Sequence, residues 1–228
     1  MALLISRTFG IRIDKHLVRR MLLKHDTSES RGDGPSWLTF LGYMKDSLWS
    51  VDLFRSESIT LRSHWVLDML DQFMRRLIGL GVWPEMVDGA GLWRMFNNII
   101  AVKEPPRHLS SDHDPLFTFH RWQANLRILE VREIKSFPTV LLSHPFIERV
   151  IGTIHREFLD HLLFWNAEDL ERKLKDFQHY YNRHRVHAPL GGQTPAEVNG
   201  ASTMEPAELN HFRWEKHSHG LIQLPRAA

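Results

Sequence analysis

The sequence contains no cysteine, and it also lacks any long apolar run. The first absence excludes a disulfide framework and any zinc site built on thiolates, and it fits the reducing cytoplasm where we expect the chain to act. The second excludes a membrane partner: the N-terminal apolar run meets Arg7 after six residues, too few for a signal peptide or a membrane span. With 43% hydrophobic and 25% charged residues, the 228-residue chain has the composition of a globular protein with a core.

The formal charge of +2 is unevenly distributed. Residues 1–25 carry six Lys or Arg against Asp14 alone, a balance of +5, so the remainder carries −3. Asp14 can cap a basic helix that follows a turn. We interpret residues 1–25 as a partial helix-turn-helix-like DNA-binding segment, with Arg19 and Arg20 as DNA contacts. A solvated basic helix is the alternative.

A polar linker rich in Gly, Ser and Pro, residues 26–36, precedes a region of mixed strand and helix patterns. The patterns predict, in order, strands over 48–54, 59–70 and 75–82, a helix over 92–100, a strand over 107–111, a helix over 119–126, a strand over 128–131, and helices over 143–184 with a break near Asn166. This order predicts an α/β fold over residues 37–198: a mixed five-stranded sheet with helices on both faces, plus helical extensions. Residues 199–228 are interpreted as a tail.

Three acidic residues fall at positions that meet at one edge of such a sheet. Asp52 lies in the first predicted strand, Asp112 follows the fourth, and Glu148 lies near the start of a helix. Two Mg²⁺ ions can stabilise the attacking and leaving oxygens of a phosphodiester reaction, and Mg²⁺ prefers carboxylate oxygen. The three residues therefore predict a two-ion site that Mn²⁺ could also fill, with no organic cofactor. Without a cation, at least one of these carboxyls should have a raised pKa.

Each of these residues, taken singly, could instead cap a turn or complement a helix dipole. Their joint pattern carries a family resemblance, because thirty-five residues separate Asp112 from Glu148, and Asp52 precedes Asp112 by 60. The motifs, in order, are Trp49-Ser-Val-Asp-Leu, Asp71-Gln-Phe-Met-Arg-Arg, Ser111-Asp-His-Asp-Pro-Leu-Phe, His144-Pro-Phe-Ile-Glu-Arg and Tyr181-Asn-Arg-His-Arg-Val-His-Ala-Pro-Leu-Gly-Gly-Gln-Thr-Pro-Ala-Glu. Over residues 35–198 the chain resembles the integrase-type (DDE) transposases, a group that includes retroviral integrases and bacterial insertion-sequence transposases.

The resemblance implies an RNase H-like fold and metal-dependent cleavage of DNA 3′ ends followed by strand transfer. It makes Asp52, Asp112 and Glu148 the metal ligands and catalytic residues, and Asp71 a supporting turn residue. The implied partners are the DNA ends of the element, target DNA and further copies of the chain. The implied location is the nucleoid of a bacterial cell.

Asp68, Asp114 and His155 are among the residues that depart from the family pattern. Asp68 lies among apolar residues of the second predicted strand, where it either faces an edge or, if buried unpaired, destabilises the fold by a few kcal/mol. Asp114, two residues beyond the second aspartate of the motif, is an alternative ligand. His155 stands where the family usually carries Lys or Arg, so we expect weaker attraction for phosphates at neutral pH.

The helix that carries Glu148 also predicts a DNA-contacting face. Its apolar stripe consists of Ile147, Ile151, Ile154 and Phe158. Gly152 and His155 lie off that stripe on the side of Glu148, and Arg149 and Arg156 are close by. A glycine there would let a DNA backbone approach closely.

Other functions remain open. A nuclease of the same fold would hydrolyse DNA without joining it, and would not need to assemble on DNA. A truncated chain that lacks most of its helix-turn-helix would only bind DNA, or would inhibit an intact transposase by entering its oligomers. The histidines of residues 179–187 also allow a zinc site, although an amphipathic helix explains the same segment.

Overall fold

The computed structural model describes residues 48–135, 145–203, 208 and 210–227. The segment interpreted as DNA-binding, with Arg19 and Arg20, and the linker after it lie outside the described residues, so their roles stay predictions. The chain divides into two compact units, one comprising residues 37–178 and the other residues 1–36 and 179–228.

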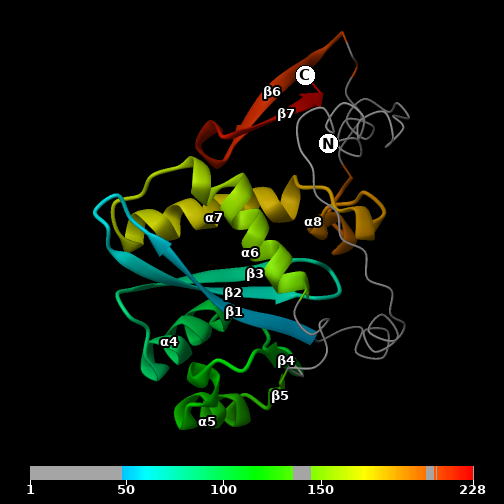
Figure 1. Cartoon of the computed structure of the whole chain (residues 1–228). Coiled ribbons are helices and arrows are strands. Elements are labelled where there is room, and N and C mark those ends of the chain that lie inside the picture. Colours follow the sequence, from blue (N-terminus) through cyan, green and yellow to red (C-terminus); the bar gives the residue numbers. More distant parts are fainter. Residues whose placement is uncertain (1–47, 136–144, 204–207, 209, 228) are drawn as a thin grey trace. The chain divides into compact units, whose positions relative to one another are not determined.

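A five-stranded sheet with the strand order β3-β2-β1-β4-β5 forms the centre of the larger unit (Figure 1). The strands are β1 (Leu48–Glu57), β2 (Ser63–Asp71), β3 (Leu77–Pro84), β4 (His108–Ser111) and β5 (Arg132–Lys135). The first three strands pair antiparallel, whereas β4 runs parallel to both β1 and β5. The mixed five-stranded sheet that the sequence predicts is confirmed.

Helices cover both faces of this sheet (Figure 1). One face carries α4 (Gly89–Ile100) and α5 (His120–Ile128), and the other carries α6 (Pro145–Glu157) and the first part of α7 (Ala167–Arg183). The apolar stripe of α4 packs on alternate residues of β1 and β2, which form a single buried cluster with it. Close packing needs Gly79, because a Cβ there would come within 2.5 Å of the Ile99 side chain. No described helix is both long and apolar enough to cross a membrane.

Two strand boundaries predicted from the sequence are wrong. The fifth strand is Arg132–Lys135 rather than 128–131, because α5 runs through Ile128 and the chain then turns at Glu130, where φ is +55°. The second strand begins at Ser63 rather than at residue 59, because a turn closed by the hydrogen bond from Ser58 N to Arg62 O (2.9 Å) takes up the preceding residues.

The smaller unit contains a short helix and also a hairpin, which lies where the sequence indicates only a tail. The short helix α8 (Pro195–Val198) begins with a capping box, in which the side chains of Thr194 and Glu197 bond each other's backbone N–H. Strands β6 (Phe212–His217) and β7 (Ile222–Ala227) pair as an antiparallel hairpin. Short 3₁₀ turns occur in the larger unit at Pro115–Thr118 (η1) and Leu159–His161 (η2). In the smaller unit they occur at Ala188–Leu190 (η3) and Ser218–Gly220 (η4).

Histidines of the smaller unit pack against one another and against an arginine. The rings of His184 and His217 are 4.1 Å apart, and the Arg226 guanidinium lies 2.7 Å from His184 Nδ1. Burial, then the charges of His217 and Arg226, lower the pKa of His184 to about 4. A guanidinium at this ring nitrogen opposes the zinc alternative here, and no three ligand side chains of the described chain are arranged around a metal position.

Candidate active site

The three candidate carboxylates come from three separate elements of the larger unit. Asp52 is half-buried on β1, Asp112 directly follows β4, and Glu148 is exposed in the first turn of α6. Parallel pairing of β1 with β4 sets Ser50 opposite Ser110, so the chain leaving β4 reaches the level of Asp52. Asp112 and Glu148 both raise the pKa of Asp52 through their charge, so each of them lies near Asp52.

Asp52 is the electrostatic centre of this cluster. Its pKa rises to about 7, first because the side chain is buried and then because Asp112, Glu148 and Asp114 are negative neighbours. The hydrogen bond from Leu53 N to Asp52 Oδ1 (2.7 Å) opposes the rise without cancelling it. The sequence-based expectation of a raised pKa at this site is confirmed.

The donor set suits a hard divalent cation. Carboxylate oxygens are the ligands that Mg²⁺ and Mn²⁺ prefer, and clustered negative charge is what such an ion relieves. Within the described ranges, however, no three acidic or histidine side chains already form a metal-holding group. A cation would therefore have to draw the carboxylates of Asp52, Asp112 and Glu148 together.

A polar network beneath the end of β4 supports Asp112, and the sequence does not reveal it. Glu133 on β5 accepts hydrogen bonds from Ser111 Oγ (2.6 Å) and Trp122 Nε1 (3.2 Å), and pairs with Lys135 Nζ at 2.7 Å. The same ammonium donates to Ser111 Oγ (3.0 Å) and lies 3.4 Å from the Asp112 carbonyl. The alternation in Glu133-Ile-Lys135 could have indicated this network, but the predicted fifth strand ended before it.

Asp114 has a structural role beside Asp112. Its Oδ1 accepts from Leu116 N (2.8 Å) and so caps η1, and its own N–H donates to Asp112 Oδ1 (3.0 Å). These bonds orient the loop that carries Asp112, and the choice of Asp112 over Asp114 as the ligand stays a prediction.

Asp71 closes the turn after β2, as the family resemblance implies. Its Oδ1 accepts from the N–H groups of Phe73 (2.9 Å) and Met74 (2.8 Å). The next residue, Gln72, donates a side-chain hydrogen bond to Ser50 on β1. This turn is therefore tied to the strand that carries Asp52.

Asp68 is a fourth carboxyl next to Asp52. The two residues lie directly opposite each other on β1 and β2, so their side chains share one face of the sheet. Asp68 is 0% exposed, and neither carboxyl oxygen has a well-directed hydrogen-bond partner among the described residues, although the Met69 amide compensates in part. Burial and then the Asp52 charge raise the pKa of Asp68 well above its usual value. Because β2 lies inside the sheet, the edge-facing alternative is wrong and the buried one is right.

Helix α6 carries the predicted DNA-contacting residues near Glu148. The side chains of Arg149 and Arg156 are exposed, and a Cβ at Gly152 would lie 2.9 Å from the Arg156 guanidinium. The glycine thus leaves room for that arginine along the helix surface. On the opposite side, the helix buries Ile147, Val150, Ile154 and the following Phe158, so Val150 takes the place predicted for Ile151.

His155 is half-exposed and held between an aromatic ring and an acid. Its ring meets the Phe54 ring edge-on at 5.3 Å, and its Nδ1 lies 3.6 Å from Asp160 Oδ1. The carboxylate of Asp160 adds negative charge where the family usually places a cation. The expectation of weak phosphate attraction at His155 stays a prediction.

Comparison with known proteins finds similar sequences and folds among the integrases. Residues 138–195, which include Glu148, match the family model of the integrase core domain. No sequence match to a curated protein was found.

Solved structures of viral integrases share the fold. The HTLV-2 integrase catalytic core domain in complex with magnesium, in its trimeric form, superposes with a TM-score of 0.52 at 16% identity, covering 67% of this chain and 95% of that chain. The simian T-cell lymphotropic virus intasome, in complex with a PP2A regulatory subunit, superposes with a TM-score of 0.57 at 14% identity, covering 80% of this chain and 67% of that chain. The sheet and its helices therefore have the RNase H-like fold of integrase catalytic cores.

Ionisation of Asp52 should destabilise the cation-free protein. The pKa of Asp52 is 3.8 in the unfolded chain and about 7 in the folded protein. The resulting contribution to the unfolding free energy is therefore fully present below pH 3.8 and is lost as the pH rises through about 7. Relative to D52N, the wild type should lose about 2–3 kcal/mol of unfolding free energy between pH 5 and pH 8. Urea unfolding in EDTA measures this difference, with E104Q at an exposed site as the control that should follow the wild type. Parallel pH profiles for wild type and D52N would contradict it.

Replacing Asp68 with an apolar residue should stabilise the fold. D68V removes a buried carboxyl without adequate partners and leaves a side chain that suits an interior strand, so the unfolding free energy should rise by about 1–3 kcal/mol. D71N is the matched comparison, and it should lower stability because it weakens a bonded turn. Chemical denaturation at neutral pH without cation measures both, and an unchanged or lower stability of D68V would show that Asp68 is compensated.

Proposed function

We propose that this chain, in which residues 138–195 match the integrase core domain and the sheet has the fold of integrase catalytic cores, is the catalytic part of a DNA transposase. The reaction would be cleavage at the 3′ ends of an insertion element followed by their transfer into target DNA. The observation that carries the proposal is the pairing of β1 with β4, which brings the chain at Asp112 level with Asp52. The pKa of Asp52, raised by burial and then by Asp112, Glu148 and Asp114, supports it.

Asp52, Asp112 and Glu148 would hold two Mg²⁺ ions in this proposal. When bound, the ions supply Lewis-acid stabilisation of charge on the attacking and leaving oxygens. The chain contributes placement: β1 fixes Asp52, while the Glu133–Lys135 network supports the backbone at Asp112. Glu148, exposed at the start of α6, would complete the set by a side-chain movement.

DNA would lie along the exposed side of α6. Arg149 and Arg156 would contact phosphates, Gly152 would leave room for the backbone, and Arg19 and Arg20 would add contacts from the N-terminal segment. Strand transfer needs two DNA ends held together, so we propose a homo-oligomer on DNA, acting at the nucleoid of a bacterial cell. Among structural relatives, the HTLV-2 core was seen in trimeric and dimeric forms.

A non-catalytic DNA-binding chain is the second candidate, and Asp68 favours it. Asp68 is a buried carboxyl opposite Asp52, and neither of its oxygens has a well-directed hydrogen-bond partner among the described residues. Such a chain would retain the fold, bind DNA and act only by entering oligomers of an intact transposase.

Nicking and joining of supercoiled plasmid test the chemistry. Wild type should convert the plasmid in Mg²⁺ or Mn²⁺ and not in EDTA, whereas E148Q should fall to background because one ligand is lost. E104Q, at an exposed site outside the cluster, should behave like wild type. Nicking without joining would identify a nuclease, and DNA binding without activity in both wild type and E148Q would identify the non-catalytic chain.

Restoring a cation at residue 155 should strengthen DNA binding. H155R places a permanent charge beside the proposed phosphate path, so affinity for duplex DNA should rise about 2–5-fold at moderate salt and the salt dependence should steepen. Fluorescence anisotropy at several salt concentrations measures both quantities. The matched change H120R, at an exposed position of α5, should have a smaller effect, and equal effects of the two would argue against a specific role for residue 155.

A further inference from the structure

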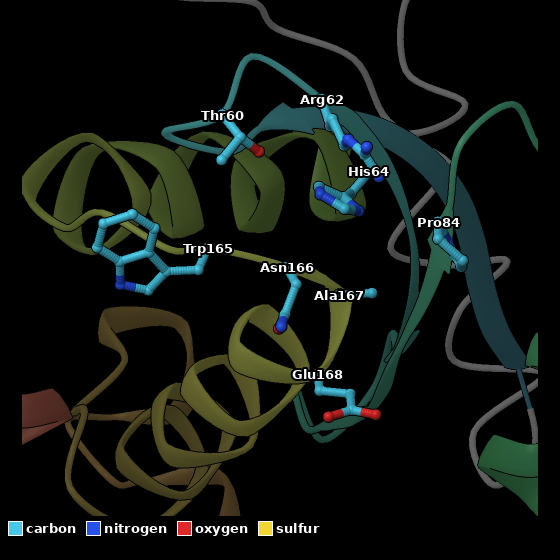
Figure 2. Close-up of a pocket in the computed structure, with 8 residues that line it drawn as sticks. All are labelled: Thr60, Arg62, His64, Pro84, Trp165, Asn166, Ala167 and Glu168. Atoms are coloured by element: carbon cyan, nitrogen blue, oxygen red, sulfur yellow. The ribbon is translucent and has the colours of Figure 1, made fainter.

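A cavity of about 690 Å³ opens on the larger unit where α7 begins (Figure 2). It lies between the turn after β1, the end of β3 and the start of α7, and none of the three candidate carboxylates lines it. Cavities that hold a small organic group have volumes of roughly 300–1,000 Å³, so this one can take a group of that size.

The indole of Trp165 lines this cavity and is 63% exposed. A second hollow, to which Arg172 contributes, adjoins the first and is also lined by Trp165. The backbone N–H of Trp165 donates to Asp169 Oδ2 (3.1 Å), which ties the indole's attachment to the first turn of α7. An exposed indole that borders open space and is anchored through its backbone is suited to stacking on a flat aromatic ligand.

Arg62 and His64 lie together on another side of the cavity (Figure 2). Burial, and then the charge of Arg62, lower the pKa of His64, so the imidazole is neutral at pH 7. His64 is only 4% exposed, and neither ring nitrogen has a hydrogen-bond partner among the described residues. A buried polar group without a partner is costly, so a ligand that bonded this ring would recover part of that cost.

Glu168 adds a hydrogen-bond acceptor to the cavity from the first turn of α7. An ionised carboxylate only accepts hydrogen bonds, and its two oxygens suit a pair of parallel N–H donors. Among the DNA bases, guanine carries such a pair on its Watson–Crick edge, whereas thymine carries a single N–H there. The carboxylate therefore favours guanine over thymine.

We propose that this cavity binds one unpaired nucleotide of a DNA strand, with its base stacked on Trp165, its Watson–Crick edge toward Glu168 and its phosphate at Arg62. A flat stacking surface, an acceptor and a cation match the face of the base, its edge and the phosphate. The base must be unpaired, because pairing in a duplex occupies both its face and its edge.

The charges around the cavity favour a DNA strand over a free nucleotide. Arg62 is the single Lys or Arg among the lining residues, so a free nucleotide would have one strong phosphate contact. A strand continues beyond the cavity, and the Arg172 side chain, 70% exposed in the adjoining hollow, lies where a neighbouring phosphate could meet it. The inference rests on the proposed function only for DNA as the source of the nucleotide.

Duplexes with one bulged nucleotide test the stacking, with binding measured by fluorescence anisotropy in EDTA so that no cleavage intervenes. Wild type should bind a guanine bulge about fivefold or more tighter than the same duplex with an abasic bulge. W165A should bring this ratio to about one, because the stacking surface is lost. W214A is the matched control, since Trp214 is 59% exposed on β6, and it should leave the ratio unchanged.

Base identity tests the acceptor. Wild type should bind the guanine bulge about threefold or more tighter than a thymine bulge, and E168Q should remove most of this preference. E104Q, at an exposed site away from the cavity, should keep it. H64L should weaken binding of the guanine bulge by about twofold or more without lowering the melting temperature, whereas a purely structural histidine would change the melting temperature alone.

Circular dichroism melting of each variant separates weakened binding from misfolding. Equal wild-type affinities for the guanine and abasic bulges, or a ratio that W165A leaves unchanged, would overturn the proposal. So would binding of dGMP as tight as that of the bulged duplex, which would assign the cavity to a free nucleotide. A plasmid assay that failed while the Trp165-dependent ratio persisted would remove the proposed chemistry and leave this site standing.

Discussion

The parallel pairing of β1 with β4 is the contact on which the candidate active site depends. Asp52 lies within β1, while Asp112 lies 60 residues later in the chain, just beyond β4. Only their side-by-side register, with Ser50 opposite Ser110, brings the two carboxyls to one place. The antiparallel pairing of β1 with β2 then adds Asp68, and α6 adds Glu148 from above the same face.

Carboxyl groups gathered in this way conflict with the stability of the sheet. Burial and mutual repulsion raise the pKa of Asp52, and burial also raises the pKa of Asp68. A cation held by the proposed ligands would recover the first loss, as at sites that trade stability for chemistry. Cation binding does not explain Asp68 in the same way, since its side chain lies opposite Asp52 and is fully buried.

The sequence alone determined the order of elements and the three candidate carboxylates. Strand and helix periodicity depend only on neighbouring residues, and the spacing of the motif can be read directly along the chain. It also indicated that Asp68 was unusual. Whether Asp68 faced an edge or the interior depended on which strands flank β2, and that is a property of the sheet rather than of residues 63–71.

The tertiary structure decided the remaining features, because they also depend on which elements pack together. The Glu133–Lys135 support of Asp112 and the pairing of β1 with β4 both join segments distant in sequence. Such contacts follow from long-range packing, which local propensity and periodicity do not encode.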